Sequence, residues 1–231
     1  MTDWDSRSKS MGVAAGAADA MRLVAMRIPA SHNGSCPKVA IDGPDGAGKT
    51  YFADELADLL RAQQRPVVRV SLDDFHNTRA VRYRLGRDSP EGFWLDSYNY
   101  RRFHSYVVAP FSPGGSRKYR TAAHDLTTDA VLNPAPRTAA PGTVLIVDGI
   151  FLHRNELGAI WDFSVFLDVP FVETARRMAS RDGTNPDPDH PSMRRYVEAQ
   201  RRYFQECSPQ QRATVLIDNT ALGCPVIVPG D

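Results

Sequence analysis

A chain of 231 residues with 42% hydrophobic residues can bury one substantial core and requires no second domain. Its 28 basic and 27 acidic residues leave a net charge of +1, and the arginines are scattered along the sequence. This pattern lacks the basic block typical of proteins that bind nucleic acid or an anionic membrane. The composition therefore favours a small anionic substrate and argues against a nucleic-acid or membrane partner.

The cysteines and the N-terminal segment indicate the compartment. Cys36, Cys207 and Cys224 are widely spaced and form no Cys-x-x-Cys pair, so they indicate neither a disulfide framework nor a zinc site. The apolar run near the N-terminus is broken by Asp19 and Arg22, which argues against a signal peptide or a membrane-spanning helix. We expect a cytoplasmic protein, and the sequence leaves open whether it forms a homo-oligomer.

Residues 1–36 are predicted to form an extension that precedes the main domain. Residues 1–12 have the composition of a disordered lead. The Ala, Met and Leu content of 13–28 predicts one helix, closed by Pro29 and a loop rich in Ser, Asn and Gly. We expect this extension to pack on the domain at 37–231 and to contribute no chemistry.

The segment from Val39 to Thr50 contains the pattern G-x-x-x-x-G-K-[ST]. An apolar run precedes the pattern, and apolar residues at helical spacing follow it, which is the strand, loop and helix order that a phosphate-binding loop requires. Its glycines let successive N–H groups converge on one anion, Lys49 can bind the terminal phosphates, and Thr50 can bind Mg²⁺. The predicted nucleotide-binding residues are Gly43, Asp45, Gly46, Ala47, Gly48, Lys49 and Thr50.

Strands and helices alternate in the rest of the chain. We expect strands over 67–70, 143–147, 163–167 and 214–217, and helices over about 171–181 and 193–206. Residues 76–141 have an Arg- and Tyr-rich composition and read as an insertion. The alternation predicts a doubly wound α/β fold with a five-stranded parallel sheet, and such folds bind ligands at the carboxyl ends of the strands.

Carboxylates stand at two of these strand ends. Asp73 and Asp74 follow the strand at 67–70, and on an extended segment only one of them can face a substrate. A carboxylate there could orient a hydroxyl and accept its proton, although a turn or N-cap aspartate is an equally common explanation. Asp148 follows the strand at 143–147 and suits a Walker-B role at Mg²⁺. Together with the phosphate-binding loop, these carboxylates favour a nucleotide-dependent phosphotransferase over a binding module.

Several segments resemble the uridine kinase and phosphoribulokinase family of P-loop kinases, and the resemblance extends over about 38–219. They are GPDGAGKT at 43–50, SLDDFHN at 71–77, DSPEGFWLDSYNY at 88–100, YRTAAHD at 119–125, VDGIFLH at 147–153 and RMASRD at 177–182. The resemblance implies an ATP- and Mg²⁺-dependent kinase with a substrate-binding insertion at 76–141 and a lid at 182–193. Its implied reaction is phosphorylation of the 5′-hydroxyl of a pyrimidine ribonucleoside, uridine or cytidine.

The same resemblance assigns roles to acceptor-site residues. It implies that Asp73 is the base toward the 5′-hydroxyl, that Asp88 holds the ribose hydroxyls, and that Asp74 falls outside the site. Tyr119 and His124 reproduce the family's Tyr-x-x-x-x-His spacing and would contact the pyrimidine. An aromatic residue and a histidine on a hairpin are also common as packing and surface residues, so that alternative stays open.

The lid segment departs from the family, whose members carry arginines there. Residues 183–192 read GTNPDPDHPS and contain none. Arg177 and Arg181 share a face of the preceding helix, and Arg194 and Arg195 open the next one. Arg181 is the best candidate to neutralise the transferred phosphoryl group, although a helix-end arginine is more often solvated or ion-paired.

Two other functions remain open at the level of sequence. The loop and Asp73 would serve another hydroxyl acceptor, such as nicotinamide riboside, pantothenate or a sugar phosphate, and Asp88, Tyr119 and His124 distinguish these acceptors from a pyrimidine nucleoside. A regulatory or non-catalytic NTP-binding module is the second alternative. The sequence has no N-K-x-D motif for guanine, and a switch would not need Asp73.

Overall fold

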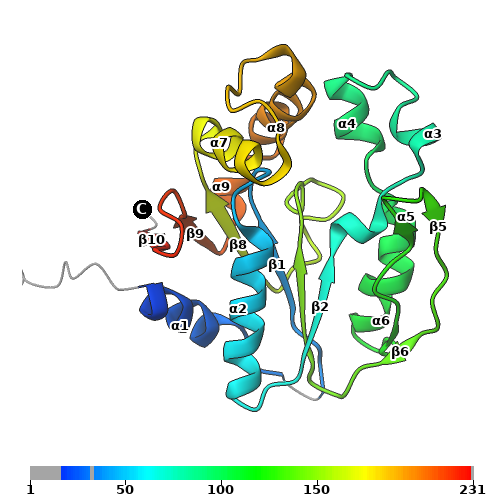
Figure 1. The fold of residues 1–231 in the computed structure, drawn as a ribbon. Helices are drawn as coiled ribbons and strands as arrows, with labels where there is room; N and C mark the ends of the chain where they lie inside the picture. The colour runs from blue at the N-terminus through cyan, green and yellow to red at the C-terminus, as the bar shows by residue number, and fades with distance from the viewer. Residues whose placement is uncertain (1–16, 32–33, 230–231) are drawn as a thin grey trace, which may run out of the picture.

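A computed structural model of the chain describes residues 17–31 and 34–229. Its centre is a six-stranded sheet with the strand order β10-β9-β8-β1-β7-β2 (Figure 1). The strands are β1 (Lys38–Asp42), β2 (Val67–Ser71), β7 (Val144–Asp148), β8 (Phe163–Asp168), β9 (Val215–Asp218) and β10 (Val226–Val228).

The five predicted parallel strands are confirmed, but the sheet has a sixth strand. β10 pairs antiparallel with β9, with Ile227 opposite Ile217. It was missed because it has three residues between Pro225 and Pro229, which is too short for a strand pattern. The sheet is therefore mixed, with its antiparallel strand at one edge.

Apolar clusters cover both faces of the sheet. Val39 and Ile41 of β1 point into one cluster, whereas Ala40 points into the other, as the two-residue period of a strand requires. Helices α1 (Ala17–Arg27) and α2 (Lys49–Ala62) pack in the first cluster. Helix α8 (Arg194–Cys207) and the insertion pack in the second.

Helix α1 lies alongside α2 in Figure 1. Met21, Val24 and Ile28 are buried in the same cluster as Phe52 and Leu56 of α2. The predicted N-terminal helix is thus confirmed over its described part, and the predicted disordered lead at 1–12 lies outside the described residues. In 17–31 and 34–229, no helix is both long and apolar enough to cross a membrane.

The segment at 76–141 stands between β2 and β7 and folds into short elements. Its helices are α3 (Arg79–Arg82), α4 (Pro90–Asp96), α5 (Tyr100–Phe103), a π-helix at His104–Val108 and α6 (Ala109–Phe111). Two small antiparallel sheets follow, one joining β3 (Lys118–Tyr119) to β6 (Arg137–Thr138) and one joining β4 (His124–Asp125) to β5 (Ala130–Val131). Helix α4 packs against α8, and the two lie side by side at the top of Figure 1.

The last part of the chain alternates helices and strands as expected. Helix α7 (Phe171–Asp182) follows β8. The segment predicted as a lid forms a loop that ends in a 3₁₀ turn at Pro191–Met193, directly before α8. A short helix, α9 (Pro209–Arg212), leads into β9.

Candidate active site

The glycine loop connects the end of β1 to the start of α2. Gly46 has a φ of 78°, in the left-handed region, and a Cβ there would stand 2.8 Å from the carbonyl oxygen of Thr174 and 3.1 Å from the Met178 side chain. Only glycine combines this backbone angle with so close an approach to α7. The loop conformation is therefore built into the sequence and into the packing of α7.

We expect Gly46→Ala to lower nucleotide affinity at least tenfold and to destabilise the fold by about 1–3 kcal/mol, because a methyl group would displace the loop from α7. Gly114→Ala is the matched control, since Gly114 has a similar φ of 74° but no neighbour within 4 Å of the added carbon. Nucleotide titration and urea unfolding measure the two effects. Equal behaviour of the two variants would contradict this prediction.

Three neighbouring elements brace the loop. The Asp45 N–H donates to Oε1 of Gln200 at 2.8 Å, and Nδ2 of Asn219 donates to the Ala47 carbonyl oxygen at 2.7 Å. Arg177 donates from Nη1 to the Gly46 carbonyl oxygen at 3.3 Å. The contacts come from α8, from the end of β9 and from α7, so the loop is held before any anion binds.

The Lys49 ammonium lies within the loop. Its Nζ donates to the carbonyl oxygens of Gly43 at 3.0 Å and Pro44 at 2.8 Å. These are uncharged partners, so a phosphate oxygen would form a stronger, charge-assisted contact with the same ammonium.

Thr50 and Asp148, both predicted from the sequence as metal ligands, are in direct contact. The Thr50 hydroxyl donates to Oδ2 of Asp148 at 2.7 Å, at the first turn of α2. A hydroxyl and a carboxylate side by side beside the loop fit Mg²⁺, which binds through few protein oxygens together with water and phosphate. The described residues contain no cluster of three His, Cys, Asp or Glu side chains.

Arg69 is a neighbour of this pair that sequence reasoning missed. Its Nη1 donates to Oδ1 of the buried Asp148 at 3.0 Å, and its Nε donates to Oδ1 of Asp54 at 2.9 Å. The only signal in the sequence is a charged residue inside the apolar run of β2. Arg69 fixes one oxygen of Asp148 and leaves the other facing Thr50.

The prediction that the chain stays extended after β2 is wrong. Leu72–Phe75 forms a single 3₁₀ turn, because the Ser71 hydroxyl accepts the N–H of Asp73 and caps it. The turn leaves both Asp73 and Asp74 exposed. Although the Asp74 side chain is accessible to solvent, the loss of hydration on its protein side and the nearby charges of Asp73 and Asp148 raise its pKa. This second carboxylate therefore also lies close to Asp73 and Asp148.

Tyr98 holds the proposed base, and sequence reasoning missed it. Its hydroxyl donates to Oδ1 of Asp73 at 2.8 Å, and its ring lies 4.5 Å from the ring of His76. Burial and the charge of Asp73 keep the pKa of Tyr98 well above its usual value, so the phenol stays a donor. Tyr98 therefore occupies Oδ1 of Asp73, and no described residue donates a hydrogen bond to Oδ2.

We expect Tyr98→Phe to lower kcat about tenfold, because the Asp73 carboxylate loses the contact that orients it. Tyr100→Phe is the matched control, since the Tyr100 hydroxyl accepts from Nη1 of Arg154 at 3.3 Å and does not contact Asp73. Steady-state kinetics at saturating substrate measure the difference. If the Tyr98→Phe enzyme were as active as the Tyr100→Phe enzyme, Tyr98 would not be the residue that orients Asp73.

Electrostatics link the loop to Asp73. Burial raises the pKa of Asp45, and this rise is opposed by the charges of Lys49 and Arg181 and reinforced by those of Asp73 and Asp182. The structure thus brings the predicted catalytic residues Lys49, Asp73 and Arg181 within electrostatic range of one loop residue. Arg181 itself forms an exposed ion pair with Asp182, with Nη2 2.7 Å from Oδ2, so its guanidinium must change partner to reach a phosphate.

The residues predicted to bind the acceptor differ in how near they lie to Asp73. His124 is buried, its Nε2 lies 3.0 Å from Oδ1 of Asp129, and its Nδ1 is buried without a hydrogen-bond partner in the described structure. His124 lies near His76. Burial is the main cause that lowers the pKa of His76, and His124 lowers it further. His124 is therefore close to the group formed by His76, Tyr98 and Asp73.

Asp88 and Tyr119 lie farther out. Asp88 is exposed just before α4, within electrostatic range of Arg195 at the start of α8. The Tyr119 ring is buried edge-on against Phe111 in the core. Within the described residues, no hydrogen bond or ring contact links either of them to Asp73. Packing of β3 against α6 explains where Tyr119 points.

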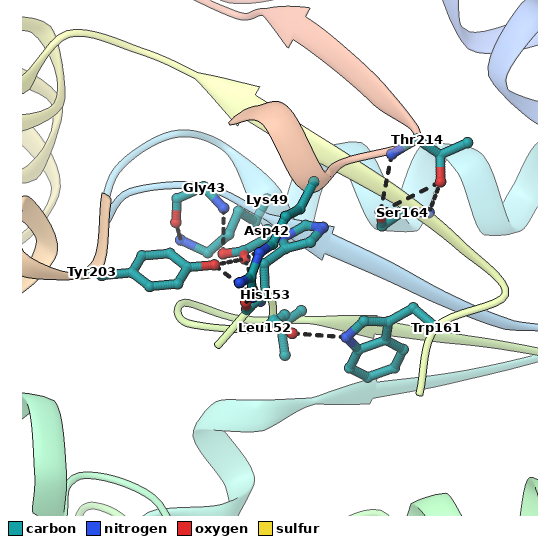
Figure 2. Close-up of polar contacts among 10 residues, drawn as sticks. Asp42, Gly43, Lys49, Leu152, His153, Trp161, Ser164, Tyr203 and Thr214 are labelled. Atoms are coloured by element: carbon teal, nitrogen blue, oxygen red, sulfur yellow. Dashed lines mark hydrogen bonds and ion pairs between the residues drawn. The ribbon is translucent and has the colours of Figure 1, made fainter. Parts of the chain in front are cut away.

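A buried group of polar side chains around Asp42 lies where β1 ends and the phosphate-binding loop begins (Figure 2). Asp42 is the last residue of β1, and its Oδ1 accepts a hydrogen bond from the Gly43 N–H at 2.7 Å. Its Oδ2 lies 2.7 Å from Nδ1 of His153 and accepts a hydrogen bond from the Tyr203 hydroxyl. Asp42 is completely buried. Sequence reasoning missed it because its partners lie far away in the chain, and the only local signal is an acidic residue closing an apolar strand.

The central parallel sheet and the glycine loop at the end of β1 define the fold of the P-loop kinases. No protein-family model matches the chain, and neither does any curated protein sequence. Solved structures do match. Such likeness at low sequence identity establishes the fold and not the activity.

Three solved structures illustrate the likeness. A protein described as a possible uridine kinase from Bacillus stearothermophilus has a TM-score of 0.67 and 22% identity, over 86% of this chain and 97% of that one. A protein provisionally described as a fructose transport system kinase from Silicibacter sp. TM1040 has a TM-score of 0.61 and 21% identity, over 80% and 94%. Phosphoribulokinase from Rhodobacter spheroides has a TM-score of 0.55 and 15% identity, over 80% and 71%.

Proposed function

We propose that the protein is a kinase that transfers the γ-phosphoryl group of ATP, with Mg²⁺, to the 5′-hydroxyl of a pyrimidine ribonucleoside, uridine or cytidine. The observation that carries the kinase part of this proposal is the exposed carboxylate of Asp73, whereas the choice of a pyrimidine nucleoside rests on the family resemblance and on His124. The Asp73 carboxylate is oriented by Tyr98 and lies within electrostatic range of Asp45 in a phosphate-binding loop. A switch or sensor has no use for a carboxylate oriented in this way.

Catalysis would rest on positioning and charge. The N–H groups of 46–50 and the Lys49 ammonium hold the β- and γ-phosphates. Asp73 aligns the acceptor hydroxyl and accepts its proton while the new O–P bond forms and the bond to the leaving ADP oxygen breaks. Thr50 and Asp148 would hold Mg²⁺, which would supply positive charge to neutralise the phosphates. Arg181 would add a second positive charge once it leaves Asp182.

The buried Nδ1 of His124 supports a polar acceptor. A buried nitrogen without a partner costs free energy in the free protein, and a hydrogen bond from a ligand would remove that cost. Its neighbour His76 is close to Asp73, so the ligand would lie beside the proposed base. A pyrimidine, with ring carbonyl and amino groups, provides such a partner.

The buried ring of Tyr119 favours a second candidate within the same class. If Tyr119 stays in the core when substrate binds, one half of the proposed pyrimidine contact is missing. A sugar phosphate, pantothenate or nicotinamide riboside would then be the better acceptor. The likeness to a phosphoribulokinase and to a protein described as a fructose system kinase is consistent with such an acceptor.

A coupled ADP-release assay tests the proposal across acceptors. We expect uridine or cytidine to give the largest kcat/KM, and nicotinamide riboside, pantothenate and sugar phosphates to give little release above background. A sugar phosphate as the best acceptor would transfer the assignment to the second candidate. ATP binding without transfer to any of these hydroxyls would instead support a regulatory NTP-binding protein.

A further inference from the structure

A cavity of about 750 Å³ adjoins the phosphate-binding loop. Its lining comes from α1, from α2 and from the segment that joins β9 to β10, and it includes Arg22, Gly48, Tyr51, Phe52 and Leu222. Its volume is that of a small-molecule site. Gly48 belongs to both the loop and the cavity, because a Cβ on Gly48 would stand 4.0 Å from Cδ2 of Leu222. A ligand held by the loop can therefore continue into the cavity.

The strand order shows which part of an NTP would enter the cavity. β2, which leads to Asp73, lies at one edge of the sheet, and β9 and β10 lie at the other. β1 and its loop stand between them (Figure 1). If the terminal phosphate faces Asp73, the nucleoside must leave the loop toward β9. The cavity lies on that side.

The lining has the chemistry of a nucleobase site. Tyr51, Leu222 and Pro225 offer apolar surface for a flat ring, and Tyr51 and Leu222 are both exposed. The Arg22 side chain is 67% exposed, and among the residues that the structure describes its one ion pair is a loose contact of 3.8 Å with Asp19. A guanidinium that is so weakly engaged can stack on an aromatic base.

Two carboxylates also line the cavity on α2, and both are already engaged. Oδ1 of Asp58 lies 2.8 Å from Nη1 of Arg61, and the Glu55 side chain is hydrogen-bonded to Tyr51. As acceptors they can receive a hydrogen bond from the amino group of either adenine or guanine, so they set no preference between these bases.

We propose that α1 forms one wall of the pocket for the nucleobase of the phosphate donor, and that Arg22 stacks on this base. The proposal rests on the kinase function proposed above, because it needs an NTP in the loop. It gives the N-terminal extension a working part in the donor site, which its sequence did not indicate.

Calorimetric titration with Mg²⁺-ATP and with inorganic tripolyphosphate tests the proposal. Both ligands engage the loop, and only ATP carries a base. We expect Arg22→Ala to weaken ATP binding about tenfold and to leave tripolyphosphate binding unchanged, a loss in the range of one cation–π stack. Met26→Ala is the matched control, because Met26 is an exposed residue of α1 outside the cavity lining, and it should change neither affinity.

Leu222→Ala examines the opposite wall, at a side chain that is 62% exposed and so is not needed for folding. We expect the same selective loss of ATP affinity. An Arg22→Ala protein with an unchanged ratio of ATP to tripolyphosphate affinity would overturn the role of α1 and leave the kinase proposal intact. A wild-type protein that binds neither ligand would overturn the kinase proposal itself.

Discussion

Replacement of Asp73 by Asn is expected to lower kcat by about 10²–10⁴, the usual contribution of a general base, and to leave ATP affinity unchanged. The amide keeps the shape of the side chain and can still accept a hydrogen bond from Tyr98. It cannot take the proton of the acceptor hydroxyl. The loss should therefore appear in the transfer step, which a single-turnover measurement at saturating ATP and acceptor isolates.

Two further variants separate this loss from a general loss of charge. Asp74→Asn removes a carboxylate from the same 3₁₀ turn, one residue away, and should retain most of kcat because Tyr98 does not hold it. Lys49→Ala removes the ammonium from the loop and should weaken both ATP binding and turnover. An Asp73→Asn enzyme that keeps more than about a tenth of the wild-type rate would show that Asp73 is not the base.

The parts of the site that the sequence predicts are those encoded locally. Gly43 to Thr50 is a contiguous motif, and Asp148 follows an apolar strand directly, so chain order alone places them at the same edge of a parallel sheet. The structure puts the Thr50 hydroxyl 2.7 Å from Asp148, as that reasoning requires. Local pattern and sheet topology were sufficient to predict that Thr50 and Asp148 lie side by side, and their roles at Mg²⁺ stay predictions.

Contacts between distant segments could not be predicted in this way. Tyr98 is separated from Asp73 by 25 residues, and an isolated antiparallel bridge to His76 places it beside Asp73. The 3₁₀ turn at Leu72–Phe75 depends on a single side-chain cap, from Ser71. A prediction from the strand pattern of β2 extends the strand past Ser71 because it does not take this cap into account. Tyr119 has the spacing expected for a ligand contact, but β3 turns its ring onto Phe111.

Asp42 represents the extreme case, because His153 and Tyr203 lie 111 and 161 residues away. Its carboxylate accepts hydrogen bonds from Gly43, His153 and Tyr203 at the base of the loop. Burial and the nearby Asp42 hold the pKa of Tyr203 well above its usual value, so this phenol remains a donor. The group is closed to solvent, and no water can replace a lost acceptor without a rearrangement.

We therefore expect Asp42→Ala to destabilise the protein by about 3–5 kcal/mol, because the substitution leaves buried donors of His153, Tyr203 and Gly43 without an acceptor. Glu206→Ala is the control, since it breaks an exposed ion pair with Arg202 on α8 and should cost at most about 1 kcal/mol. Urea unfolding measures both free energies. The Gly43 N–H begins the phosphate-binding loop, so the same variant should also bind ATP more weakly at temperatures where it is still folded. If Asp42→Ala matched Glu206→Ala in stability, the buried group would not be what holds the loop to the sheet.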